Sequence, residues 1–162
     1  MEGFLETQRA YAAGLFDGEG CVELFMRPTG RNKKGNVDNS MRAVLSVTGK
    51  DQRPLQWLLE TFGGYIQIST HPKRPHHQPV GRWSVTASKA DVFAEAIHPY
   101  LRVKKEQVEI WMEARSLMYS RGRIRGKRSL SEEEVSYRRS LVAQVSDLKG
   151  TAIQPDGTPW QT

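Results

Sequence analysis

The nine residues AAGLFDGEG, at positions 12–20, decide the fold because they close a helix with small, acidic and glycine residues in one run. The surrounding residues TQRAYAAGLFD are mostly small or apolar and predict a short helix over 7–17, which two glycines then end. Ala10 and Gly14 are four residues apart, so they share a face of this helix. A face that small permits close approach of another backbone.

Asp17 and Glu19 fall at the C-terminal end of this helix, where partial negative charge and unpaired carbonyls disfavour carboxylates. Acidic residues in such an unfavourable position are typical of functional sites. A bound cation would reverse the penalty, since a hard divalent cation such as Mg²⁺ prefers carboxylate and carbonyl oxygens. The alternative is an ordinary Asp-Gly turn between a helix and a strand. The residues alone leave both interpretations open.

Several downstream segments alternate between the two faces of an extended chain, which is the period of a β-strand. Residues 21–27 and 40–48 follow this pattern, and the polar, glycine-containing segment between them predicts a long hairpin. Residues 65–70 and 82–87 predict a second strand pair. The loop between them contains three prolines, which exclude regular structure there.

Further helices are expected between and after these strands. They span 51–62, 89–98 with Ser88 as the cap, 104–120, and Ser131 to Gly150. The order α-β-β-α-β-β-α, followed by more helix, predicts an α+β fold in which helices cover one face of a four-stranded sheet. We expect a single domain over residues 1–150 and an irregular C-terminal tail over 151–162.

The composition narrows the function classes. A net charge of +6 and a pI of about 9.6 favour a polyanionic partner, chiefly nucleic acid or an anionic membrane surface, although a merely basic soluble protein stays open on charge alone. No run approaches the roughly 20 apolar residues of a membrane span, and residues 1–9 do not resemble a secretory signal. Cys21 is the single cysteine. We therefore expect a reducing intracellular compartment, either a bacterial or phage-host cytoplasm or an organelle.

The run at 12–20 resembles the LAGLIDADG motif of homing endonucleases, with Ala12 for the first leucine and Phe16 for isoleucine. The predicted order of elements matches that family's core. VTGKDQRP, at 47–54, and PYLRVKKEQ, at 99–107, resemble its second-strand exit and the segment that supplies an active-site lysine. The resemblance covers roughly residues 4–120. It implies a four-stranded antiparallel sheet that forms a DNA-binding saddle.

The resemblance also implies an active site. Glu19 and the carbonyl of Gly18 would bind Mg²⁺, with Mn²⁺ or Ca²⁺ able to substitute for binding, while Asp17 would orient the turn. Lys104 would stabilise negative charge, and Gln52 and Arg53 would lie near the scissile phosphate. The implied reaction is hydrolysis of both DNA strands, leaving 5′-phosphates. Some relatives have a glutamine that orders water at the position of Gly49, so this chain departs from the family there.

A single motif in a chain of this length resembles the family members that act as homodimers on a pseudo-palindromic double-stranded DNA target. The small residues Ala10, Ala13 and Gly14 would then form the dimer interface.

The sheet face away from the helices would lie in the DNA major groove, as in the family. The expected base readers are the outward alternate residues Glu23, Arg27, Arg42, Ser46, Gln67, Ser69, Arg82 and Ser84. Phe25 and Val44 fall on the same face, where such residues are usually present for packing. The expected phosphate contacts are Arg31, Lys33, Lys34, Lys73, Arg74, Arg121, Arg123, Arg125, Lys127 and Arg128. His71, His76 and His77 are interpreted as a polar loop rather than as a metal site.

Two alternatives share this fold and charge. One is a maturase or other DNA- or RNA-binding protein that no longer cuts, and the other is a DNA-binding regulator. A maturase is expected to lose the acid at the end of the motif, whereas Glu19 is present here. A regulator is expected to lack the pair of Glu19 and Lys104 or to carry an added helix-turn-helix domain, and the sequence shows neither feature. An endonuclease is therefore the favoured interpretation.

Overall fold

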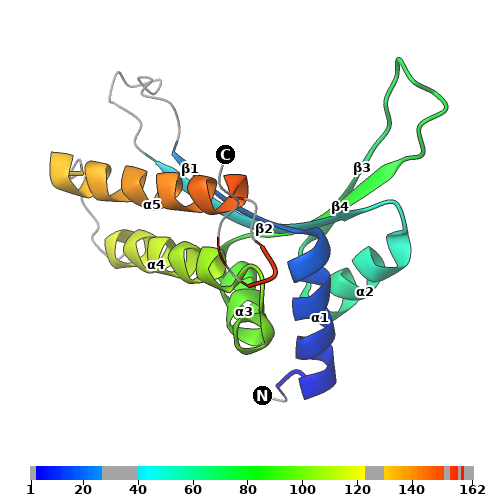
Figure 1. The fold of residues 1–162 in the computed structure, drawn as a ribbon, viewed down its shortest axis with the longest axis horizontal. Helices are drawn as coiled ribbons and strands as arrows, with labels where there is room; N and C mark the ends of the chain where they lie inside the picture. Colours follow the sequence, from blue (N-terminus) through cyan, green and yellow to red (C-terminus); the bar gives the residue numbers. More distant parts are fainter. Residues whose placement is uncertain (1–2, 27–39, 123–129, 152–153, 157, 159–162) are drawn as a thin grey trace.

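The computed structural model describes residues 3–26, 40–122, 130–151, 154–156 and 158. It is an α+β fold in which a four-stranded antiparallel sheet carries helices on one side (Figure 1). The strands are β1 (Gly20–Met26), β2 (Met41–Gly49), β3 (Tyr65–Ser69) and β4 (Val80–Val85). The helices are α1 (Glu6–Glu19), α2 (Gln52–Phe62), α3 (Ala87–Ile97), the short 3₁₀ helix η1 (His98–Tyr100), α4 (Lys105–Gly122) and α5 (Glu132–Gly150).

The strand order in the sheet is β1-β2-β4-β3, so the two hairpins meet where β2 pairs with β4. Glu23 lies opposite Val44, and Gln67 lies opposite Arg82. β1 begins at Gly20, directly after the last residue of α1, with no connecting loop. The end of the motif helix is therefore also the start of a sheet strand.

The core lies between the sheet and the helices. Alternate residues of the first hairpin, such as Val22, Leu45 and Val47, point into it and are buried, which confirms the predicted period of two. Trp83 of β4 is fully buried, and its indole N–H donates to the carbonyl of Gly63 at 2.8 Å. Phe93 of α3 packs against Trp83 with ring centroids 4.9 Å apart. These contacts attach the helical layer to the centre of the sheet.

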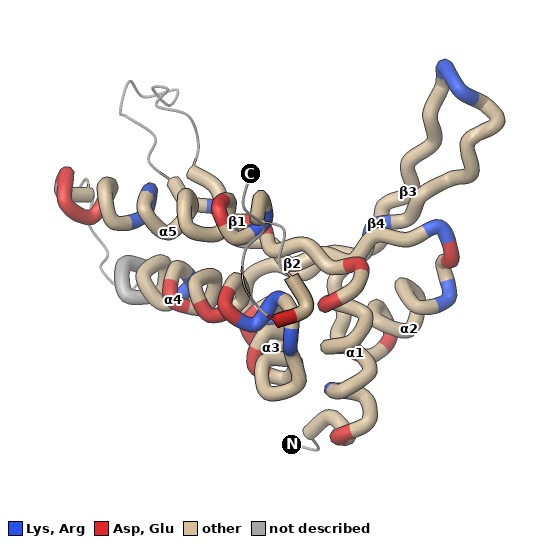
Figure 2. Tube along the Cα trace, in the orientation of Figure 1, with Lys and Arg blue, Asp and Glu red and all other residues tan. Residues whose placement is uncertain are grey.

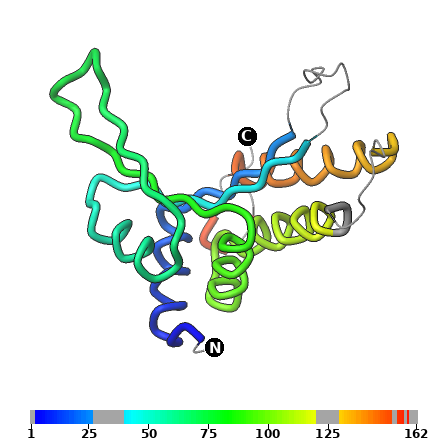
Figure 3. The backbone as a smooth tube through the Cα atoms, turned by 180° about the vertical axis from the view of Figure 1, so that it is seen from behind, coloured from blue at the N-terminus to red at the C-terminus, as the bar shows by residue number. Residues whose placement is uncertain are grey.

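The view from behind shows the same layering, with the described helices below the sheet or beside its edge and none over its upper face (Figure 3). α5 contacts α4 and the edge strand β1. Its N-cap is Ser131, whose hydroxyl accepts from the N–H of Glu134 at 3.2 Å, as the sequence predicts. None of the helices in the described residues is long and apolar enough to cross a bilayer.

The junction of β4 and α3 differs from the prediction. β4 starts at Val80 rather than at residue 82, and α3 starts at Ala87 rather than at residue 89. The chain turns into the helix at Ala87, which has a positive φ of 53°, and the N-cap is Thr86 without a side-chain hydrogen bond. The expectation that Ser88 caps this helix is therefore wrong. A left-handed turn at an alanine leaves no signal in the sequence.

Candidate active site and nucleic-acid interface

Asp17, in the last turn of α1, binds the loop that follows η1. Its carboxylate oxygens accept three backbone N–H groups, from Arg102 at 2.8 Å, Val103 at 3.1 Å and Lys104 at 2.9 Å. The ammonium of Lys104 also donates to the main-chain carbonyl of Asp17. Four hydrogen bonds thus join two segments more than 80 residues apart in sequence. They place the predicted active-site lysine at the end of the motif helix.

Glu19 ends α1 with an exposed side chain, two residues beyond Asp17. Within the described part of the chain, no hydrogen bond or ion pair engages its carboxylate. The two acids of the motif therefore differ in role. Both carboxylate oxygens of Asp17 accept backbone amides, whereas the carboxylate of Glu19 is available to a cation.

The donor set at the end of α1 fits a hard divalent cation. The carbonyl of Phe16 accepts the N–H of Gly20, and that of Asp17 accepts Lys104, so Gly18 and Glu19 provide the terminal carbonyls of the helix. Carboxylate and carbonyl oxygens suit Mg²⁺, which prefers about six oxygen ligands, several of them water. No group of three His, Cys, Asp or Glu side chains in the described residues could hold an ion.

An exposed stripe runs along α1 toward this site. Ala10, Gly14 and Gly18 are exposed, and a Cβ atom added at either glycine would have no atom within 4 Å. Packing within the chain therefore does not explain these glycines. Ala13 is fully buried in the chain's own core, so the expectation that it contacts a partner is wrong. It lies about 100° around the helix from Gly14, which places it on the inward face.

The exit of β2 carries the predicted polar pair Gln52 and Arg53. Asp51 is the N-cap of α2 and accepts the backbone N–H of Arg53 at 3.0 Å, and the two side chains form an ion pair at 2.6 Å. The side-chain hydrogen bond from Arg53, with its backbone N–H, lowers the pKa of Asp51 to about 2, and Asp51 in turn raises the pKa of Arg53. Arg53 is thus held at the helix start by an acid that the sequence reasoning did not consider.

Gln52 and Gly49 lie close to Gly81 on the neighbouring strand. Gly49 pairs with Gly81, and the amide of Gln52 occupies the space that a Cβ at Gly81 would need. A Cβ at Gly49 would instead meet a single atom, the carbonyl oxygen of Asp51, at an ordinary 3.6 Å. Packing within the chain therefore does not require a glycine at position 49, where some relatives have glutamine.

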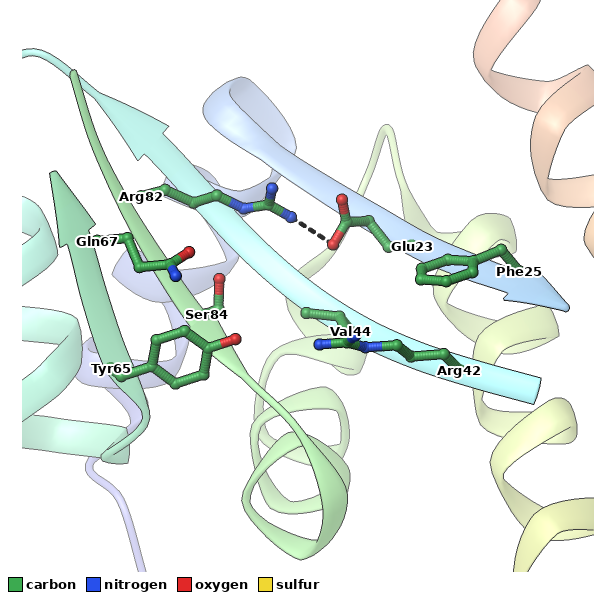
Figure 4. Close-up of a pocket in the computed structure, with 8 residues that line it drawn as sticks. All are labelled: Glu23, Phe25, Arg42, Val44, Tyr65, Gln67, Arg82 and Ser84. Atoms are coloured by element: carbon green, nitrogen blue, oxygen red, sulfur yellow. Dashed lines mark ion pairs between the residues drawn. The ribbon is translucent and has the colours of Figure 1, made fainter. Parts of the chain in front are cut away.

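The upper face of the sheet forms a shallow pocket of about 240 Å³ (Figure 4). Four predicted base readers with exposed or partly exposed side chains line it, namely Glu23, Arg42, Gln67 and Arg82. Phe25, Val44, Tyr65 and Ser84 complete the lining. Tyr65 was missed by the sequence reasoning, although its period-two spacing from Gln67 could have identified it.

Two other predicted readers, Ser46 and Ser84, are almost inaccessible, although Ser84 forms part of the pocket lining. Ser46 and Ser84 pair across β2 and β4 and are only 1% and 2% exposed. Direct base contact by either hydroxyl, as expected from the strand pattern, is therefore wrong for this conformation. Both serines lie on the two central strands of the sheet, while Ser69 at the end of β3 is exposed.

The predicted phosphate contacts are described only in part. Lys73 and Arg74 are exposed in the connection between β3 and β4, which carries basic residues at its raised tip (Figure 2). His71 and His77 lie in the same connection with ring centroids 6.1 Å apart. The remaining expected contacts lie outside the described residues or, for Arg121, have an undescribed side chain: Arg27, Arg31, Lys33, Lys34, Arg121, Arg123, Arg125, Lys127 and Arg128.

Comparison with known proteins identifies structures that share this fold. No family model and no curated protein match the sequence. Among solved structures, the chain is similar to the homing endonuclease I-CvuI in complex with its target in the presence of calcium, at 15% identity and a TM-score of 0.57, over 87% of this chain and 96% of that one. It is also similar to the archaeal intron-encoded homing endonuclease I-Vdi141I complexed with DNA, at 16% identity and a TM-score of 0.56, over 87% and 98% of the two chains.

A third similar structure has a longer chain. The LAGLIDADG homing endonuclease I-LtrWI, bound to target DNA, matches with 18% identity and a TM-score of 0.60 over 86% of this chain but only 44% of its own. This chain thus spans less than half the length of that relative and nearly all of the other two. At these identities the similarity establishes the fold, which is that of the LAGLIDADG homing endonucleases.

Proposed function

We propose that this chain, which has the fold of the LAGLIDADG homing endonucleases, is a site-specific endonuclease that cuts both strands of DNA as a metal-dependent homodimer. One observation carries the proposal: Asp17 and Lys104 join the end of the motif helix to a basic loop, beside the free carboxylate of Glu19. An acid and a lysine gathered below a polar, open sheet face suit phosphodiester hydrolysis.

Each residue at this end of α1 has a distinct task. Glu19 and the Gly18 carbonyl would bind Mg²⁺, with Mn²⁺ or Ca²⁺ able to replace it for binding. The bound cation supplies positive charge at the scissile phosphate and makes water a better nucleophile. Lys104 holds a second positive charge there, which offsets the negative charge that develops during cleavage. Arg53 is 90% exposed and, although paired with Asp51, can turn to a phosphate.

A second copy of the chain would complete the site. At the end of α1 the described residues supply one free carboxylate, that of Glu19, and the exposed stripe of Ala10, Gly14 and Gly18 permits two α1 helices to approach closely. Two carboxylates facing each other across a twofold axis repel unless cations lie between them. A homodimer presents two identical sheet faces, so its target should be pseudo-palindromic. By similarity to I-Vdi141I, we propose that the gene is carried in an intron or intein.

The test begins with selection of bound duplexes from a randomised library, followed by cleavage assays in Mg²⁺ and in EDTA. We expect cleavage in Mg²⁺ only, and we expect Glu19→Gln to bind the same duplex without cutting it. Binding without cleavage by the wild type in Mg²⁺ would instead indicate a maturase or a regulator. Cleavage by Glu19→Gln at the wild-type rate would remove Glu19 from the metal site.

A further inference from the structure

An ion pair crosses the upper sheet face between two strands that are not neighbours. Arg82 of β4 reaches over β2, and its guanidinium contacts the carboxylate of Glu23 on β1 (Figure 4). Both side chains are partly exposed, at 39% for Arg82 and 26% for Glu23. The Nε atom of Arg82 is buried, with no hydrogen-bond partner in the described part of the chain. The outer edge of the guanidinium is thus the part that faces the open pocket.

Fold stability does not account for this pair. A partly exposed ion pair contributes about 0–1 kcal/mol. A glutamate on a surface that meets a polyanion is repelled by it, whereas pairing with Arg82 cancels that repulsion. The second arginine of the pocket, Arg42, differs because its guanidinium lies 6.0 Å from the ring centroid of Phe25 and has no ion pair within the described residues.

The pair offers hydrogen-bonding groups in a definite order. The major-groove edge of a G·C pair presents two acceptors on guanine, N7 and O6, followed by one donor, the N4 amino group of cytosine. Arg82 offers N–H donors, and the adjacent carboxylate of Glu23 offers an acceptor. An A·T pair presents an acceptor, a donor and an acceptor, so its adenine amino group would meet the donors of Arg82.

We propose that Glu23 and Arg82 act as one unit that reads a single G·C pair in each half-site, with guanine under Arg82 and cytosine under Glu23. Glu23 has two functions in this unit: it accepts from cytosine, and it holds the guanidinium in one orientation before DNA binds. A fixed fork loses less conformational freedom on binding than a free arginine. The inference rests on the proposed DNA recognition by this face.

The experiment uses the wild-type protein and duplexes selected from a randomised library, then a panel of single-base variants of the selected site. We expect one position per half-site at which G·C is preferred over A·T by roughly tenfold to a hundredfold. Arg82→Ala and Arg82→Lys should both relax the preference at that position alone, because lysine retains the charge but not the fork. Glu23→Gln should reduce the same preference while it raises affinity for unrelated duplexes, since one negative charge is removed.

Arg42→Ala is the matched control, because Arg42 lies on the same face and has no acidic partner among the residues that the structure describes. It should leave the preference at the Glu23–Arg82 position intact. The inference is overturned if Arg82→Ala relaxes no G·C position, or if Glu23→Gln changes affinity for all duplexes equally and leaves the preference unchanged. Wild-type protein that selects no sequence at all would overturn the proposed function as well. If the wild type selects a site but the variants change its base preference in another way than expected, only this inference is overturned.

Discussion

Replacing Asp17 with asparagine tests how the structure positions Lys104. One carboxylate oxygen accepts the N–H groups of Val103 and Lys104, and the other accepts that of Arg102. Asparagine keeps one oxygen but turns the other position into an N–H donor that faces an N–H group. One hydrogen bond is lost and two become neutral.

The magnitude follows from these three bonds. A hydrogen bond to a charged group contributes about 1.5–3 kcal/mol, roughly twice a neutral one. Asp17 is only partly buried, so the lower end applies. We expect Asp17→Asn to lower the free energy of unfolding by about 3 kcal/mol. Loosening the loop that carries Lys104 should slow single-turnover cleavage by about 10²-fold, the cost of roughly 1 Å of misplacement at a reacting centre.

Asp91→Asn provides the control for this experiment. Asp91 forms a two-bond ion pair with Arg115 between α3 and α4, at 2.8 Å for each bond, away from the motif. It should lose stability with little effect on the cleavage rate. We expect DNA affinity, measured by titration in Ca²⁺, to change little in either variant. If Asp17→Asn cleaves at the wild-type rate, or if Asp91→Asn slows cleavage as much, Asp17 does not position Lys104.

Three further predictions concern other parts of the molecule. Gly14→Leu should separate the subunits without unfolding the chain, because a Cβ there meets no atom within 4 Å; sedimentation at micromolar concentration should show a dimer for the wild type and a monomer for the variant. Arg53→Ala should return the pKa of Asp51 from about 2 toward its ordinary 3.8, as measured by NMR titration of the carboxyl carbon. The contribution of the Asp51–Arg53 pair to stability is complete above about pH 4 and is lost as the pH falls through 2. An unchanged titration midpoint in the variant would show that Arg53 does not lower the pKa of Asp51. Lys73→Ala should weaken binding to all duplexes alike and reduce the salt dependence of affinity, whereas a change in base preference would indicate a reading role.

The sequence predicts the layers of this fold but not the contacts that assemble the site. Period-two patterns identify the strands because one face of each must be buried, as Val22 and Leu45 are. The amides that Asp17 binds lie about 85 residues away, and no local pattern encodes such a contact. The ion pair between Glu23 and Arg82 depends on the strand order β1-β2-β4-β3, which hairpin patterns leave open.

Ala13 shows a different limit. Small residues along the motif helix all suit close packing, and only the helical phase separates those that face a partner from those that face the core. Ala13 is fully buried in the chain, while Gly14 beside it is exposed. One step around a helix is about 100°, so neighbouring residues with the same chemistry serve different surfaces.

Because α1 passes directly into β1, the backbone fixes the distance between the end of the helix and the residues of the strand. Glu19 and Glu23 are four residues apart with no loop between them. Along a strand, four residues span about 13 Å, at roughly 3.3 Å each. DNA rises by about 3.4 Å per base pair, so this span corresponds to about four base pairs. If the chain has the proposed function, the distance between the cleaved bond and the first base pair that Glu23 contacts would be set by the backbone itself, and one inserted residue would both lengthen it and turn the reading side chains to the opposite face.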